Sequence, residues 1–471
     1  MAFSIIKSLM LLRLLTLLSV AITIISCGSD EIDPTLFPEE NEELSGGLTT
    51  IFDESPNAFG LQAPNLSSDE GLLFFVGNSF FNQNWVTSPS STTARDGLGP
   101  YFNARACSSC HFKDGRGRPP EFSGELNTGL LLRLGSNTLD AHGGSSADIN
   151  YGGQLQDQSI LGIMEEGGFE ILYSEVTGEY EDGTKYSLRK PLYKLLGLNY
   201  GDLSADTQIS PRVAQQMIGL GLLEAVSEQD IVAMADENDS NNDGISGKPN
   251  YVWNVEKQSK TIGRFGWKAN QPTVLQQSAG ALNGDIGITS RLFPDENCVK
   301  GCDDLANGGE PEIDDDDLDK IALYSSTLAV PARRNWDDQQ VLKGKKVFNE
   351  IGCQNCHIPK LTTGQHPSIE ALSNQEIRPY TDLLLHDMGE GLADNRPDFE
   401  ANGKEWRTAP LWGIGLVNIV NSHTFFLHDG RARNLEEAIL WHDGEGKSAK
   451  DAFLALELSN RQHLITFLES L

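Results

Sequence analysis

The sequence predicts a mainly α-helical protein made of two similar units, and the prediction depends on features that occur in both. Each unit carries the motif CxxCH, at residues 107–111 (CSSCH) and 353–357 (CQNCH). Ahead of each motif, in residues 67–85 and 335–352, apolar side chains recur at helical spacing, although the first pattern is weaker. We therefore expect a helix before each motif and a short loop leading into the cysteines.

A second helix is predicted after each motif. Residues 317–331 are the candidate in the first unit and residues 451–471 in the second. A helix on either side of a CxxCH loop is typical of a cytochrome c domain. The polar stretch 331–338 separates the units, so we expect an N-terminal cytochrome c-like domain at 60–333 and a C-terminal one at 334–471.

The first unit is enlarged by an insertion between about residues 130 and 300, where Gly/Asp turns alternate with short apolar runs. This pattern predicts short strands and loops. Within it, Asp239, Asn241 and Asp243 precede a glycine, as in calcium-binding loops. Because Asn250 occupies the place of the usual bidentate acid, a bound calcium ion and a plain polar turn remain open alternatives.

The N-terminus predicts an exported chain. Residues 1–27 have two basic residues at the front and an apolar run of signal-peptide length. The run ends in Ile-Ile-Ser-Cys, which resembles a bacterial lipobox with Cys27 as the lipidated residue. Residues 28–59 are polar and acidic and suit a flexible tether. We expect a lipoprotein of the cell envelope, in the outer membrane or facing the periplasm.

The charge balance narrows the choice of partners. The chain has 36 basic and 67 acidic residues, a formal net charge of −31, which argues against nucleic-acid binding. Basic or neutral soluble partners are compatible with it, and so is an acidic surface that only maintains solubility.

The cysteines of the two motifs predict covalently attached haem c. Two cysteines at this spacing form thioethers with the haem vinyl groups, and the adjacent histidine binds the iron. Four thiolates could instead bind zinc, but zinc explains neither histidine, and an exported chain is where c-type haem is attached. The predicted haem-binding residues are Cys107, Cys110, His111, Cys353, Cys356 and His357.

Cys298 and Cys302 remain, in a polar loop. In an oxidising compartment two cysteines at close spacing usually form a disulfide, so we expect one here. Closing so small a ring would mainly stiffen the loop, because the entropic gain is about 2 kcal/mol.

A resemblance to a known family adds to this interpretation. Residues 426–439, FLHDGRARNLEEAI, resemble the signature of the bacterial di-haem cytochrome c peroxidase and MauG superfamily. The segments GLGPYFNARACSSCHFKDGRGRPP, GRFGWKANQPT and EWRTAPLWGIG are similar to the di-haem oxidoreductase family within it. The resemblance spans about residues 60–471. It implies two haem groups and an oxidoreductase activity.

The resemblance also implies a second axial ligand for the C-terminal haem. In these peroxidases that ligand is the residue fourteen positions after the loop histidine. The loop histidine of this chain is His428, so the ligand position is His442. Asn434 and Glu437 form a capping-box pattern at the start of the intervening helix. Met388 is the alternative ligand.

The N-terminal haem departs from the family pattern. The superfamily places a histidine about sixteen residues after the first motif, where this chain has Asn127, and His142 is the nearest alternative. If neither coordinates, this haem is open to peroxide, and acid–base groups must stand beside it. The candidates for acid–base and pocket roles are Gln154 or Gln156, Glu165 or Glu166, and His428. The alternative for the glutamates is an ordinary surface position.

We therefore expect a peroxidase that reduces hydrogen peroxide with electrons passed from the C-terminal to the N-terminal haem. A small cytochrome or cupredoxin is the expected donor, and Trp267 or Trp336 is a candidate relay, although each can be a simple core residue. The alternatives are a non-catalytic di-haem electron carrier, or an enzyme that oxidises a protein or small-molecule donor.

Overall fold

The helix before the first motif, α2 (Ser68–Asn82), begins with a complete capping box between Ser67 and Glu70. It packs against α7 (Asp315–Thr327) through Gly77, where a Cβ atom would lie only 2.2 Å from the backbone oxygen of Lys320. The absence of a side chain therefore permits the close approach of the two helices.

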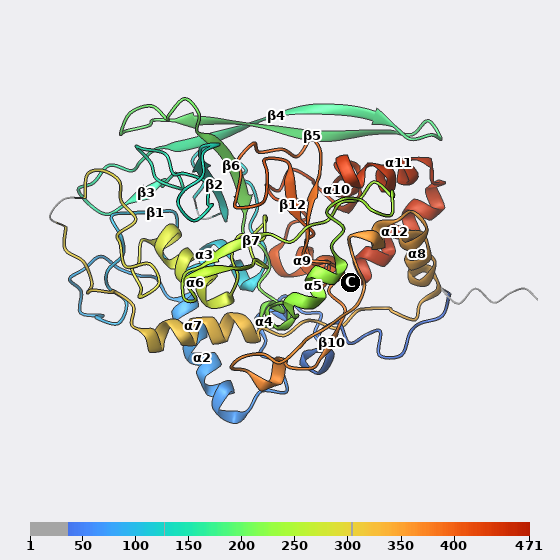
Figure 1. Ribbon diagram of the computed structural model, residues 1–471, viewed down its shortest axis with the longest axis horizontal. Coiled ribbons are helices and arrows are strands. Elements are labelled where there is room, and N and C mark those ends of the chain that lie inside the picture. The colour runs from blue at the N-terminus through green and yellow to red at the C-terminus, as the bar shows by residue number, and fades with distance from the viewer. Residues whose placement is uncertain (1–35, 127, 303–304) are drawn as a thin grey trace, which may run out of the picture. The chain divides into compact units, whose positions relative to one another are not determined.

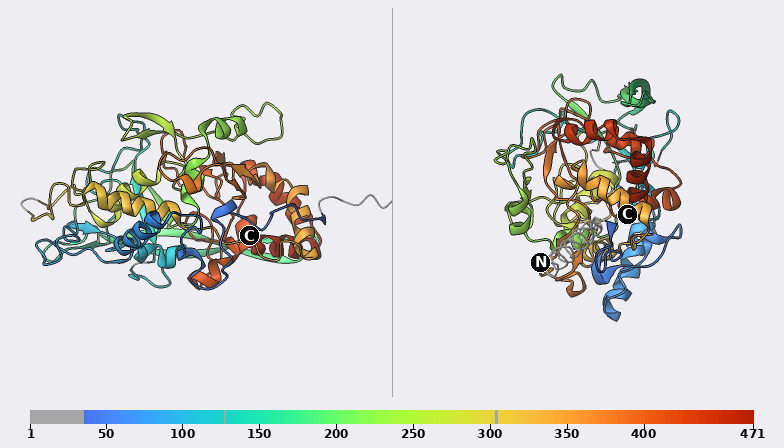
Figure 2. Two further views of the ribbon diagram at one scale, coloured as in Figure 1. Left: turned by 90° about the horizontal axis from the view of Figure 1, so that it is seen from below. Right: turned by 90° about the vertical axis from the view of Figure 1, so that its right-hand side faces the viewer.

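The second motif has the same arrangement. Helix α8 (Gln339–Glu350) packs against α12 (Leu458–Ser470) through Gly344, where a Cβ atom would lie 2.0 Å from the oxygen of His463. Phe348 and Phe467 join the two helices with ring centroids 5.1 Å apart. Figures 1 and 2 show the two helix pairs in different parts of the molecule. Helices are thus present where the sequence predicts them on either side of each motif.

Nevertheless, the prediction of a mainly α-helical fold is wrong. Only 29% of the chain is helical and 18% is in strands, which form small sheets. The structure does not support the prediction of two cytochrome c-like domains. The physical reason is that helical spacing is confined to the surroundings of the motifs. The Gly- and Asp-rich middle of the chain and the segment after the second motif consist largely of paired strands and irregular loops, with short helices between them.

The strands pair in antiparallel twos: β1 with β3, β2 with β6, β4 with β5, β7 with β8, β9 with β10, and β11 with β12. Their bounds are β1 Tyr101–Phe102, β2 Leu130–Gly135, β3 Gln158–Ser159, β4 Gly168–Glu179, β5 Lys185–Leu196, β6 Gln208–Val213, β7 Tyr251–Asn254, β8 Ser259–Ile262, β9 Leu361–Thr362, β10 Glu376–Ile377, β11 Leu385–Asp387 and β12 Glu405–Arg407. The remaining helices are α3 Cys107–Cys110, α4 Leu220–Ala225, α5 Glu228–Met234, α6 Val274–Ala281, α9 Val417–Asn421, α10 Leu435–Leu440 and α11 Lys447–Ala455.

The hairpin β4–β5 links distant parts of the chain. It extends along one side of the molecule towards α10–α12 (Figure 1). There the hydroxyl of Tyr180 donates to Glu436, and Asp182 forms an ion pair with Arg461 at 2.8 Å. The hairpin therefore ties the predicted insertion to the C-terminal helices.

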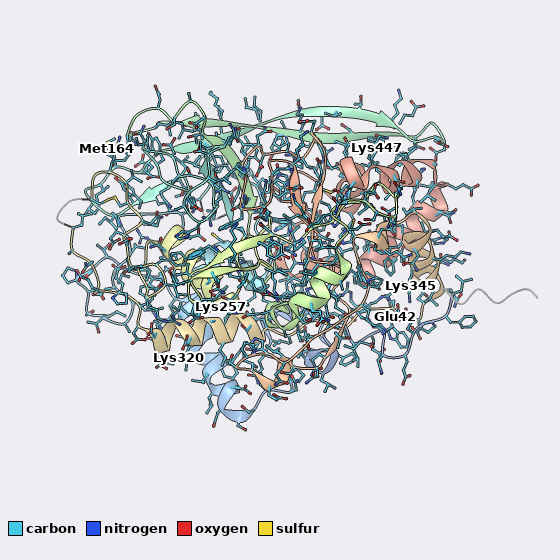
Figure 3. The ribbon with its side chains drawn as sticks, viewed as in Figure 1. Glu42, Met164, Lys257, Lys320, Lys345 and Lys447 are labelled. Atoms are coloured by element: carbon cyan, nitrogen blue, oxygen red, sulfur yellow. A yellow bond between two sulfur atoms is a disulfide. The ribbon has the colours of Figure 1, made fainter. Side chains whose placement is uncertain are left out.

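The computed structural model describes residues 36–126, 128–302 and 305–471. The predicted signal peptide with Cys27, the first part of the predicted tether (residues 28–35), and Asn127 lie outside these ranges. Pro38–Leu471 form one compact unit, and the domain boundary at 333/334 stays a prediction. Residues 38–59, which the sequence places in the tether, include Glu42, which is buried in ion pairs with Arg333 and Lys345 (Figure 3). None of the helices in the described ranges combines the length and hydropathy that a bilayer crossing requires.

Candidate functional site

One cavity of about 660 Å³ reaches both CxxCH motifs and is lined by residues from both halves of the chain. This volume lies within the range of ligand and cofactor sites, roughly 300–1,000 Å³.

At the first motif, Cys107 and Cys110 lie on the short helix α3, and His111 follows directly. The Nδ1 atom of His111 is 2.7 Å from the backbone oxygen of Gln215. Because a carbonyl oxygen can only accept, Nδ1 carries the proton and Nε2 keeps its lone pair. Burial lowers the pKa of His111 and raises that of the Cys107 thiol to about 12, so the histidine is neutral and the thiols are protonated.

At the second motif, His357 has the same geometry. Its Nδ1 donates to the backbone oxygen of Tyr380 at 3.0 Å, which leaves Nε2 free. Burial lowers the pKa of His357 to about 4 and raises that of the Cys353 thiol to about 12. Both motifs thus present two thiols and one neutral imidazole to the same cavity.

His442 is one of the further histidines of the C-terminal half that line the cavity. Its helix, α10, is capped by Asn434, whose side chain accepts from the Glu437 amide at 2.8 Å. The Nδ1 atom donates to the oxygen of Ala438 at 2.8 Å, and the side chain lines the cavity. His442 and His357 both line the cavity, and a positive charge on His442 would lower the pKa of His357. Met388, the alternative ligand, also lines this part of the cavity.

These residues fit haem in their chemistry. Metal-binding histidines usually donate the other ring nitrogen to a carbonyl or carboxylate, as His111, His357 and His442 do here. The cavity wall also contains Arg116 and Arg407, which form no ion pair with any described residue. Burial lowers the pKa of each to about 10. A carboxylate-bearing cofactor such as haem would supply the missing negative charge.

The cavity wall near the first motif carries a polar cluster. Gln154 is only 3% exposed, and its amide nitrogen donates to Asp285 at 3.0 Å, while its oxygen has no partner in the structure. Arg133 lies 3.7 Å from the same carboxylate. Asp285 is in a π-helical turn, Leu282–Ile286, a distortion that is frequent at functional sites. Its charge contributes to the raised pKa of both Cys107 and Cys110. We name Gln154, Asp285 and Arg133 the N-terminal polar cluster.

Four of the sequence-based candidates, Gln156, Glu165, Glu166 and His142, are not part of the cavity wall. Glu165 is exposed. Glu166 is buried, accepts from the Gln156 amide at 2.8 Å and has its pKa raised to about 8 by burial, but it is not part of the cavity wall. His142 is also outside this wall, since it is exposed and stacks on Trp253 with ring centroids 4.1 Å apart.

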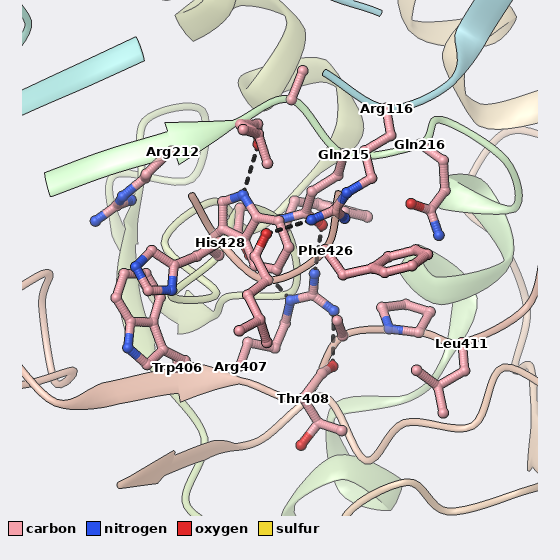
Figure 4. Close-up of a pocket in the computed structure, with 18 of the residues that line it drawn as sticks. Arg116, Arg212, Gln215, Gln216, Trp406, Arg407, Thr408, Leu411, Phe426 and His428 are labelled. Atoms are coloured by element: carbon pink, nitrogen blue, oxygen red, sulfur yellow. Dashed lines mark hydrogen bonds between the residues drawn. The ribbon is translucent and has the colours of Figure 1, made fainter. Parts of the chain in front are cut away.

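His428, Trp406 and Trp267 belong to the cavity wall, whereas Trp336 does not. His428 stacks on Trp406 with centroids 3.8 Å apart, and burial lowers its pKa to about 4 (Figure 4). Trp267 lines the cavity and donates through Nε1 to the oxygen of Val213 at 2.8 Å. Trp336 is half-buried and lies outside the cavity wall.

Sequence reasoning missed His386 as well as Asp285. The two ring nitrogens of His386 lie 2.9 Å from Asp382 and 2.7 Å from Glu445, and Nδ1 is 3.7 Å from Cys356 Sγ. The two carboxylates raise the pKa of His386 well above its ordinary value despite burial, so it is a charged imidazolium. The available signal was a polar residue at the end of the apolar run 383–385.

The candidate calcium loop is exposed. The Asp239 carboxylate accepts from the amides of Asp243 and Gly244, and Asn241 donates to Asp243 at 3.1 Å. These bonds form an exposed polar turn, and calcium binding stays a prediction. Cys298 and Cys302 are joined by a disulfide in the structure.

Comparison with known proteins gives the family. The family model described as "Di-haem oxidoreductase, putative peroxidase" matches residues 40–471. No curated protein matches this chain. The family model covers both CxxCH motifs, the polar cluster and His442, and implies two haem groups. The chain therefore belongs to the di-haem oxidoreductase family.

Proposed function

We propose that this protein reduces hydrogen peroxide in the part of the cavity beside His111, with electrons that enter beside His357 and His442. The observation that carries the proposal is the asymmetry of the two halves. The C-terminal half supplies two neutral histidines with a free Nε2. The N-terminal half supplies one such histidine and, in place of the second, a carboxylate with an amide and a guanidinium.

The polar cluster suits the proton transfers that the reaction needs. Reduction of H₂O₂ to two waters consumes two electrons and two protons, and when bound, haem supplies the redox-active iron. In this proposal Asp285 accepts a proton from one peroxide oxygen and returns it to the other. Gln154 and Arg133 hold its carboxylate, and the unpartnered oxygen of Gln154 can accept a further hydrogen bond.

Trp267 is the best-placed aromatic side chain between the two halves. It lines the cavity, and the guanidinium of Arg116 lies 5.1 Å from its ring centroid. Its indole is fixed by Val213, two residues before the Gln215 oxygen that holds His111. A buried, rigid indole in this place favours electron transfer between the two motifs.

The predictions from the sequence about haem attachment, export, lipidation, the electron donor and calcium are part of the same proposal. Attachment is covalent, through thioethers at both motifs. The chain is exported, carries a lipid at Cys27 and receives electrons from a small cytochrome or cupredoxin. Asp239, Asn241 and Asp243 bind calcium; if so, chelation lowers the melting temperature of the wild type and not that of Asp243→Asn, and equal shifts would leave only a turn.

Spectra of the purified protein test the main proposal. We expect one low-spin and one high-spin ferric signal in paramagnetic resonance, because His442 is available as a second ligand beside His357, whereas His142 of the N-terminal half lies outside the cavity wall. Hydrogen peroxide should perturb the high-spin signal, and each peroxide consumed should oxidise two equivalents of a one-electron donor. Two low-spin signals with no peroxide consumption would instead identify an electron carrier.

A further inference from the structure

Arg407 ends strand β12 and is 5% exposed at the cavity wall. Each of its three guanidinium nitrogens donates a hydrogen bond: Nε to the oxygen of Gly266 at 3.0 Å, one terminal nitrogen to the oxygen of Thr408 at 3.1 Å, and the other to Oε1 of Gln215 at 2.8 Å. Its backbone amide donates to the oxygen of Trp267 at 2.9 Å, and the residue pairs with Leu385 of β11. The guanidinium is therefore held in one orientation.

Two of these bonds lead to the histidines of the motifs. Towards the first motif, Gln215 provides both the side-chain oxygen that Arg407 holds and the backbone oxygen that accepts from His111 Nδ1 at 2.7 Å. Figure 4 shows Gln215, Arg407 and Thr408 in succession along this wall of the cavity. Arg407 therefore fixes the residue that orients His111.

Towards the second motif, the Thr408 oxygen that accepts from Arg407 also accepts from the hydroxyl of Thr381 at 2.5 Å. Thr381 directly follows Tyr380, whose backbone oxygen accepts from His357 Nδ1 at 3.0 Å. Hydrogen bonds and short covalent segments thus connect the imidazole of His111 to that of His357, with Arg407 in the middle.

We propose that Arg407 is a positioning residue shared by the two iron-binding histidines and that it sets the reduction potentials of both haems together. The inference rests on the two-haem function proposed above. A hydrogen bond from Nδ1 raises the basicity of an imidazole ligand, and a more basic ligand stabilises ferric iron. Loosening Gln215 and Thr381 weakens both bonds, so both potentials should rise.

Arginine is specifically suited to this position. Its planar guanidinium presents rigidly directed donors, which here reach three acceptors at once. Lysine keeps the charge but has a single nitrogen on a flexible chain, and it cannot reproduce the three directions. Arg407→Lys therefore removes the geometry and keeps the charge.

The test is a spectroelectrochemical titration of the full-length protein loaded with haem, in the absence of peroxide. In Arg407→Lys we expect the equilibrium constant for reduction to increase about tenfold at each haem, which is ~59 mV for one electron. Gln215→Ala should shift only the N-terminal haem, and Thr381→Val only the C-terminal haem. The matched control is Arg461→Lys, a buried arginine on α12 that donates to a carbonyl and a carboxylate outside the cavity wall; it should shift neither.

Clear results would overturn the proposal. If the Arg407→Lys variant binds two haems but the reduction potential of only one haem shifts, or of neither, then Arg407 does not have a shared role. If Arg407→Lys does not fold, Gln215→Ala and Thr381→Val decide, because an unchanged potential in either variant refutes the corresponding link. No peroxide is present, so a wild type that binds two haems but does not consume peroxide refutes the proposed function and not the role of Arg407.

Discussion

The two CxxCH motifs have similar local geometry and different surroundings. In both, the histidine donates Nδ1–H to a distant backbone oxygen, that of Gln215 at 104 residues in one case and that of Tyr380 at 23 residues in the other. The C-terminal motif then meets a second neutral histidine, His442, whereas the N-terminal motif meets Asp285 with Gln154 and Arg133. The difference teaches that each motif supplies two thiols and one histidine, while residues far away in sequence supply the groups that distinguish the two sites.

The charges around the motifs differ as well. Beside Cys356, the imidazolium of His386 is flanked by the carboxylates of Asp382 and Glu445, so each proton-binding group there has a partner. Beside Cys107, the Asp285 carboxylate is 3.7 Å from its nearest cation, Arg133, and its side chain is 21% exposed in the structure. A carboxylate with looser pairing is the better candidate for moving protons.

The largest effect should come from removing the cysteines of the first motif while those of the second motif are kept. Cys107→Ala combined with Cys110→Ala removes both predicted thioethers of the N-terminal haem. We expect the mass of the mature protein to fall from two haems to one and peroxide turnover to be lost, while the low-spin signal of the C-terminal haem persists. A colourless wild type that contains zinc would disprove haem attachment at both motifs.

Asp285→Asn should have the next largest effect. The amide keeps the shape of the carboxylate but cannot accept and return a proton, so we expect peroxide turnover to fall about 10²- to 10⁴-fold. Haem content and spin states should stay as in the wild type. Asp206→Asn, at an exposed position in a turn, is the matched control. Unchanged turnover in Asp285→Asn would remove the acid–base role that distinguishes the N-terminal half.

His442→Gly should convert the C-terminal haem from low-spin to high-spin and slow electron delivery about 10- to 100-fold. The reason is that the free Nε2 of His442 is lost, while His357 keeps its bond to Tyr380. Paramagnetic resonance measures the spin states, and stopped-flow reduction measures delivery.

His428→Ala serves as the comparison for this variant, because His428 stacks on Trp406 and should leave the coordination number unchanged. If His442→Gly keeps its low-spin signal and Met388→Leu loses one, then Met388 is the ligand.

The elements near the motifs were predictable because their signals are local. The cap of Asn434 and the apolar spacing of α8 are visible in a few consecutive residues. The hairpin β4–β5 was visible in part, since apolar runs flank an Asp-Gly turn at Asp182. Extending the helical pattern to the whole chain failed because these signals occupy only a small part of it.

The rest of the site could not be predicted, because its members are far apart in sequence. Asp285 meets Gln154 across 131 residues, and Arg407 meets Gln215 across 192. Asp285 follows Asn-Gly after a helix, a sequence that reads as a turn and carries no periodic signal. Glu165 and Glu166 are acid–base candidates from the sequence, but Glu165 is exposed and Glu166 is buried against the Gln156 amide, outside the cavity wall.

The smallest effect is expected on the pH dependence of stability, through Glu166. This residue is connected to the N-terminal polar cluster through Gln156. Burial raises its pKa from 4.5 to about 8, and the nearby charge of Asp148 adds to the shift. Between these values the folded protein keeps the proton while the unfolded chain releases it, so stability falls as pH rises from about 4.5 to about 8. The loss is on the order of 3–5 kcal/mol for one group, since one pKa unit is about 1.4 kcal/mol.

Glu166→Gln should remove this pH dependence, because the glutamine amide oxygen can still accept from the Gln156 amide but carries no charge. We expect the melting temperature of the variant to match the wild type near pH 4.5 and to exceed it at pH 8. The effect reaches the N-terminal polar cluster because Gln156 also donates to the oxygen of Gly284, at 2.7 Å, next to Asp285. If the melting temperatures of the two proteins instead change in parallel from pH 4.5 to 8, then Glu166 is ionised in the folded state. Asp285 would then be the remaining acid that distinguishes the N-terminal half.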